Sequence, residues 1–185
     1  GFEFLLHIGR TLENYLDLQV FSICGLNEFL PFESKDFPGR FYYKNTGTSR
    51  RQGYELSLRK QLSNKWSVVL NHSKNYMKGT DITINLPGIP QHLSQLQLYF
   101  YDGKKIQFKF DNTLVGKIYL TSSSPSNISN YVVGGLQASY VFRGKNADCT
   151  LTAGLNNLYG VKYHNNLSIN AAAGHDYVQV DPAVY

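Results

Sequence analysis

The sequence alternates between apolar and polar side chains with a period of two, in runs that reach ten residues or more. The clearest run covers residues 106–120. Successive side chains of a strand point to opposite faces, so such runs predict strands with one apolar and one polar face. The apolar phase of this run holds Ile106, Phe108, Phe110, Leu114 and Ile118, and the polar phase holds Gln107, Lys109, Asp111, Thr113 and Lys117.

The same alternation recurs along much of the chain. Residues 16–20 begin another such run, although a helix could also be drawn there, and residues 1–8 look like a strand. We therefore expect an all-β, antiparallel fold of about eight strands. The other clear runs are residues 54–59, 66–76, 95–100, 136–142 and 150–156.

The connections between these runs are short and long in turn. Short polar turns are expected at residues 62–65, 101–105 and 143–148, where Gly, Asn and Asp suit a tight turn. This order places all short turns at one rim and all long loops at the other, as in an up-and-down barrel of the bacterial outer membrane. Long links are expected at residues 31–39, 77–91, 121–130 and 159–177.

Composition supports a membrane barrel over a soluble β-sandwich, whose strands are typically about five or six residues long. Aromatic residues make up 14% of the chain, with 14 Tyr and 11 Phe, and they gather near the expected strand ends. Aromatic girdles at both interfaces are typical of membrane barrels. No run approaches the roughly 18 apolar residues of a transmembrane helix, and the net charge of +5 is spread too evenly for a nucleic-acid patch.

Few residues are candidates for catalysis, metal binding or ligand contact. Cys24 and Cys149 lack metal-type spacing, and the sequence does not decide whether they pair. We find no pattern of an enzyme, of a metal site or of a bound cofactor. The candidates for ligand contact lie in one expected extracellular loop: Tyr163, His164, His175 and Tyr177. A polar loop without a ligand is the simpler interpretation of the same residues.

Three local motifs narrow the class of protein. Residues 45–56 (NTGTSRRQGYEL) resemble the N-x-G-x-S-R-x-x-G-x-E strand of TonB-dependent outer-membrane receptors. Residues 86–92 (LPGIPQH) look like the entry into that family's next strand, and residues 154–163 (GLNNLYGVKY) are similar to its N-L-F-type signature near the penultimate strand. The three motifs occur in the family's order and at about its spacing.

The resemblance implies a transmembrane barrel of 22 strands, filled by an N-terminal plug. This chain, residues 1–185, would be about the last third of that barrel, its C-terminal segment, without the plug; it would be either cut inside a longer protein at both ends or one piece of an assembly. Such receptors take up scarce nutrients, most often a ferric siderophore or another iron complex. Uptake is powered by the TonB–ExbB–ExbD complex, which pulls on a segment ahead of the plug.

We therefore expect an active-transport receptor of the bacterial outer membrane, in contact with lipid and with an iron complex. Glu55 and Arg59 share the polar phase, as charges in a membrane wall must, and Gly53 would allow a close approach. Two alternatives remain open: a passive porin-like barrel and a soluble β-rich binding domain. Ligand identity is not readable from the loops.

Overall fold

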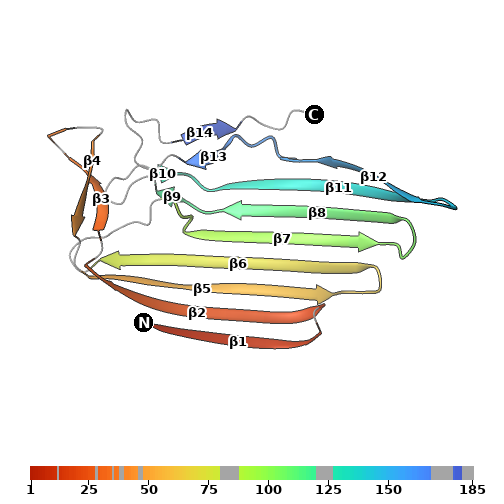
Figure 1. Ribbon diagram of the computed structural model, residues 1–185, viewed down its shortest axis with the longest axis horizontal. Helices are drawn as coiled ribbons and strands as arrows, with labels where there is room; N and C mark the ends of the chain where they lie inside the picture. Colours follow the sequence, from red (N-terminus) through yellow and green to blue (C-terminus); the bar gives the residue numbers. More distant parts are fainter. Residues whose placement is uncertain are drawn as a thin grey trace.

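The computed structural model describes residues 1–11, 13–27, 29–34, 36–37, 40–45, 48–79, 88–119, 127–167 and 177–180. Eight strands form one sheet in the order β1-β2-β5-β6-β7-β8-β11-β12, and every neighbouring pair is antiparallel. Figure 1 shows them side by side in a single layer. The strands are β1 (Phe2–Thr11), β2 (Asn14–Leu26), β5 (Thr48–Gln61), β6 (Trp66–Gly79), β7 (His92–Tyr101), β8 (Ile106–Val115), β11 (Tyr131–Arg143) and β12 (Asp148–Leu155).

All-β, antiparallel, up-and-down order is thus confirmed. The β1–β2, β5–β6, β7–β8 and β11–β12 turns are short and lie at one end of the sheet, and the long connections lie at the other (Figure 1). Residues 16–20, which could have been helical, belong to β2.

Three links that were expected to be loops contain short hairpins. The first holds β3 (Phe29–Glu33) and β4 (Phe41–Asn45), the second β9 (Ile118–Tyr119) and β10 (Asn127–Ile128). The third holds β13 (Tyr163–Leu167), paired with β14 (Tyr177–Val180). These strands are two to five residues long, too short for alternation to mark them.

The register proves the two faces that the alternation predicts, because residues directly opposite in a ladder share a face. One ladder row joins Leu6, Leu18, Leu56, His72 and Ser94, and the next residue along each strand belongs to the other face. We call the face with Leu18, Leu56 and Leu98 the apolar face, and the face with Asp17, Glu55 and Gln97 the polar face.

The sheet buries almost nothing against itself. Among the described residues, the only buried hydrophobic side chains are Val115, Ile118 and Ile128. Large side chains of the apolar face are exposed, including Phe4 at 56% and Leu151 at 63%. A single layer with a bare apolar face has no core in water, since stable domains need a second layer. The apolar face therefore needs an apolar surrounding.

The apolar stretch shifts along the ladder from strand to strand. One row joins Ile8, Leu16, Leu58, Leu70 and Leu96 to Asn112 and Gly134. In β1 this row lies next to the short turn, whereas in β8 and β11 it holds Asn112 and Gly134, and most of the apolar residues of those strands lie below it, toward the short turns. A membrane imposes an apolar band at one height across all strands. Because the apolar residues shift along the register from strand to strand, the strands are tilted relative to this band, as barrel closure requires.

Two details differ from the sequence prediction or complete it. The run expected over residues 106–120 is interrupted at residues 116–117, between β8 and β9. A side chain at Gly116 would collide with the His92 ring, with a Cβ only 2.6 Å from Nδ1, so the close approach of His92 explains the local irregularity.

Cys24 and Cys149 are both free and exposed.

The turn between β7 and β8 is held by one carboxylate. Asp102 Oδ1 accepts hydrogen bonds from the backbone N–H groups of Lys104, Lys105 and Ile106, at 2.8, 2.8 and 2.9 Å. Gly103 sits at φ +83°, a conformation that glycine adopts without strain. The hydrogen bond from Ile106, followed by that from Lys104, lowers the pKa of Asp102 below its usual 3.8.

Replacing this carboxylate should make the turn's stability independent of acid. Asp102→Ala is expected to lower the free energy of unfolding at neutral pH, and the difference from wild type should fade as pH falls through the depressed pKa, below 3.8. Unfolding of both proteins across an acid series measures this. Asp148→Ala, at the start of β12 on the same rim, is the control; a pH-independent difference for Asp102→Ala would contradict the account.

Candidate functional site

The carboxylates of the sheet all lie on one face. Lys109 and Asp111, which the sequence placed on the polar phase, form an ion pair there with Nζ 3.5 Å from Oδ1. Charges and amides in mid-strand need water or polar partners. The polar face is therefore the hydrated side of the sheet. Its carboxylates in the eight strands are Glu3, Asp17, Glu55, Asp111 and Asp148.

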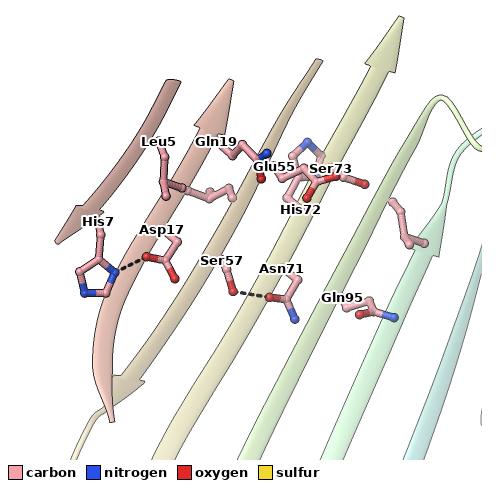
Figure 2. A pocket seen from close by; sticks show the side chains of 12 residues that line it. Leu5, His7, Asp17, Gln19, Glu55, Ser57, Asn71, His72, Ser73 and Gln95 are labelled. Atoms are coloured by element: carbon pink, nitrogen blue, oxygen red, sulfur yellow. Dashed lines mark hydrogen bonds and ion pairs between the residues drawn. The ribbon is translucent and has the colours of Figure 1, made fainter. Parts of the chain in front are cut away.

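One register row of the polar face forms a continuous polar track across five strands. It consists of His7, Asp17, Ser57, Asn71 and Gln95, from β1, β2, β5, β6 and β7. His7 pairs with Asp17, and Ser57 donates a hydrogen bond to Asn71 Oδ1 at 2.6 Å (Figure 2). The Asn71 and Gln95 amide groups keep N–H donors for a partner. We call this row the polar row.

The polar row lies in a hollow of about 680 Å³ on the polar face. Neighbouring rows add Gln19, Glu55 and Ser73 (Figure 2). Leu5, Leu56 and Leu93 supply apolar patches. Seven of the twelve lining side chains are amides, hydroxyls or carboxylates, so the hollow offers hydrogen bonds to a polar partner, such as a polypeptide surface. Among the described residues, no group of His, Cys, Asp and Glu could hold a metal ion.

A second cluster lies at the long-loop end of the sheet. The Tyr131 and Tyr163 rings stack with centroids 5.4 Å apart and planes 25° apart. Tyr131 also packs against the small buried cluster of Val115, Ile118 and Ile128. The packing fixes Tyr131, and Tyr131 in turn orients Tyr163. We call these two tyrosines the rim pair.

The candidate ligand residues are partly brought together. Tyr163 and His164 open β13, and Tyr177 opens the partner strand β14, where it pairs with Leu167. Tyr163, His164 and Tyr177 therefore share one two-stranded hairpin instead of the expected loop. His175 lies outside the described residues.

Sequence reasoning missed several residues of both clusters. Asp17 and Gln19 were not assigned because residues 16–20 also fitted a helix, and a helix would have scattered their side chains. Tyr131 was seen only as one of many strand-end aromatics. Its stacking on Tyr163 depends on a contact between strands far apart in sequence, which alternation does not reveal.

No helix in the described part of the chain has the length and apolarity to span a membrane.

The NNLYG segment, residues 156–160, follows β12 and belongs to the third sequence motif, and its side chains fix the local backbone. Asn157 takes φ +51°. Its side-chain amide donates a hydrogen bond to the Val161 carbonyl oxygen at 2.9 Å and accepts one on Oδ1 from the Val161 backbone N–H at 3.1 Å. The Tyr159 ring then covers Gly134, and its hydroxyl donates to Asn112 Oδ1 at 3.0 Å.

Solved structures share this fold. The chain matches the ferric-catecholate import receptor Fiu from K12 E. coli, closed form, with a TM-score of 0.70 and 19% identity, covering 97% of this chain and 25% of that one. It matches the siderophore receptor PiuA from Acinetobacter baumannii with a TM-score of 0.72 and 18% identity, covering 97% of this chain and 26% of that one. The match to the copper transporter OprC has a TM-score of 0.73 and 17% identity, and it covers 97% of this chain and 29% of that one.

The chain thus spans about a quarter of the length of the structures it matches. A comparison with curated proteins gives no match. The model of the family "TonB dependent receptor-like, beta-barrel" matches residues 10–158, which include seven of the eight strands of the sheet almost entirely. On this match, together with the tilted antiparallel sheet and its two faces, the chain belongs to the TonB-dependent receptor β-barrel family.

Proposed function

We propose that the complete protein imports a scarce nutrient across the bacterial outer membrane, with energy delivered through TonB. The family-model match over residues 10–158 carries this proposal. The two-faced sheet agrees with it, because a barrel wall in lipid has an apolar outside and a polar lumen. Residues 1–185 would form the C-terminal part of the barrel wall.

The polar row gives the lumen side a role in this transport. An N-terminal plug of the same protein would lie against the polar face and use the hollow as one of its contacts. The row offers amide donors beside the Asp17 and Glu55 carboxylates, which suits a polypeptide with backbone carbonyls and Lys or Arg side chains. The contacts must be weak enough to release when TonB pulls, and exposed polar pairs are weak.

The nutrient is proposed to be a ferric siderophore or another iron complex. Two of the matched structures are receptors for ferric-catecholate and siderophore ligands, and one is a copper transporter. Iron complexes of this class are large, with aromatic or carbonyl-rich surfaces. Stacked phenol rings such as the rim pair supply flat apolar contact together with a hydrogen-bonding hydroxyl. His164 and Tyr177, on the same hairpin as Tyr163, are further candidates, and His175 is a candidate from the sequence.

Uptake by intact cells tests the function. A strain that lacks its own siderophore receptors and expresses the complete protein should accumulate radiolabelled iron from one siderophore of a panel. Deleting tonB should abolish that accumulation while surface binding of the ferric complex remains. Uptake that persists without TonB would instead establish a passive channel, and saturable TonB-dependent uptake of a copper complex alone would move the ligand class from iron to copper.

The rim pair gives a sharper expectation for ligand contact. Tyr163→Ala is expected to raise the Kd of the ferric complex up to about tenfold, since aromatic contacts are worth about 0.5–1.5 kcal/mol beyond their buried area. Equilibrium binding to cells without TonB isolates this step from transport. Tyr101→Ala, at the short-turn rim, is the matched control and should leave Kd unchanged. An unchanged Kd for Tyr163→Ala would remove Tyr163 from the ligand site.

A further inference from the structure

The segment between β12 and β13 leaves the ladder of the sheet before it reaches the rim pair. β12 pairs with β11 as far as Leu155, which lies opposite Leu136. If this pairing continued, Gly160 would lie opposite Tyr131. Instead Tyr163, three residues further along the chain, stacks on Tyr131. The segment therefore takes up three extra residues on its way to the rim pair.

Asn157 gathers the extra residues into one turn. Its side chain bonds both the N–H and the carbonyl of Val161, and its own carbonyl accepts a hydrogen bond from the Gly160 N–H at 2.9 Å. Asn157 and Gly160 take φ of +51° and +59°, a conformation that these two residue types tolerate. Asn157 is only 4% exposed, so its amide needs these partners. We call residues 157–161 the Asn157 turn.

Tyr159 fastens the Asn157 turn to two strands of the sheet. The Leu158 N–H donates to the Gly134 carbonyl oxygen at 2.8 Å, and the Tyr159 hydroxyl donates to Asn112 Oδ1 at 3.0 Å. Gly134 on β11 and Asn112 on β8 lie opposite each other in the ladder. The ring occupies the space that a side chain at Gly134 would fill, since a Cβ there would lie 2.8 Å from Tyr159 Cε2.

The fastened turn and the rim pair meet on the same strand. Gly134 holds the turn, and Tyr131, three residues away on β11, stacks on Tyr163. Tyr131 is itself fixed by its packing against the small buried cluster. The Asn157 turn delivers the chain to the start of β13, so its position decides where the Tyr163 ring lies relative to Tyr131.

We propose that Asn157 and Tyr159 are positioning residues for Tyr163, the ring assigned above to contact with the imported iron complex. Stacked aromatic rings attract each other only within a narrow range of centroid distances and offsets, so a displaced turn would cost the Tyr163 ring its place. The effect on ligand binding rests on the proposed function. The effect on the position of the ring rests on the contacts alone.

The position of the Tyr163 ring is measured first, without ligand. In the complete protein in detergent, meta-fluorotyrosine replaces Tyr163, and its fluorine resonance reports the ring current of Tyr131. Tyr159→Ala and Gly134→Ala, which pushes the Tyr159 ring aside, are expected to move the resonance toward its value in Tyr131→Leu. Gly135→Ala, the next residue on β11 but on the polar face, is the matched control and should leave the resonance in place. An unmoved resonance in both test variants overturns the proposal.

Equilibrium binding of the ferric complex to cells without TonB measures the consequence. Tyr159→Ala is expected to raise Kd about threefold to tenfold, and no more than Tyr163→Ala does. In the Tyr163→Ala background the same change should alter Kd by less than about twofold, because no ring remains to be positioned. Asn157→Gly keeps the backbone freedom but loses the amide, and should act like Tyr159→Ala. Tyr159→Phe keeps the ring over Gly134 and should lie nearer to wild type.

The two measurements separate the ways of failing. Losses in Kd that multiply in the double variant would mean that Tyr159 acts independently of Tyr163, which overturns the proposal. A lower free energy of unfolding in Tyr159→Ala with an unmoved resonance would make the turn a structural brace alone and overturns it as well. A moved resonance together with an unchanged Kd in Tyr163→Ala would remove the rim pair from the ligand site and leave the positioning of the ring standing.

Discussion

Leu98→Lys is expected to lower the free energy of unfolding of the complete protein by about 2–4 kcal/mol, the cost of a Lys on the lipid face at mid-membrane. Leu98 lies in the middle of the apolar band, with Val68 and Phe110 beside it in the same row. Within the eight described strands, no carboxylate lies on that face to pair with a new cation. Refolding from urea into phosphatidylcholine vesicles measures the free energy.

The neighbouring residue provides the control for this substitution. Gln97 lies on the polar face opposite Asp111, so Gln97→Lys should change stability by less than about 0.5 kcal/mol. The two variants share charge, strand and depth, and they differ only in the face. A similar loss in both would contradict the assignment of the lumen and lipid sides, and with it the membrane placement of the sheet.

The sequence predicted the sheet well because each strand obeys one simple rule. A lipid-facing side and a wet side force alternation at every position, so residues 66–76 or 106–115 are readable alone. Turn chemistry at Asp102 and Gly103 marked the short connections in the same way. The order of strands followed, because short turns oblige consecutive strands to pair.

The hairpins and both clusters were less readable for physical reasons. β13 and β14, with five and four residues, are too short to show a periodic pattern of apolar and polar side chains. The polar row depends on register, which joins residues such as His7 and Gln95 across five strands, and the rim pair depends on a contact between Tyr131 and Tyr163. A register follows from pairing in space. Alternation within one strand tells only which face a residue takes, not which residue lies beside it.

Gly53 shows where a local rule and the fold disagree. A glycine within a strand is usually a weak point, and Val is a favourable strand residue, so propensity predicts that Gly53→Val stabilises the protein. In the sheet, a Cβ at Gly53 would lie 2.6 Å from Phe21 Cζ and would also collide with the Lys74 carbonyl oxygen. Real Cβ atoms do not approach other atoms so closely, and the backbone carbonyl has little room to move.

Gly53→Val is therefore expected to destabilise the protein by about 1–3 kcal/mol, the usual range for overpacking. A double-mutant cycle with Phe21→Ala separates the two collisions. Removing the ring should recover part of the loss, and the remainder belongs to the Lys74 carbonyl and should persist in the double variant. The urea assay measures all four proteins. Greater stability in Gly53→Val than in wild type would show that strand propensity outweighs the close approach, and that β2, β5 and β6 can separate locally without cost.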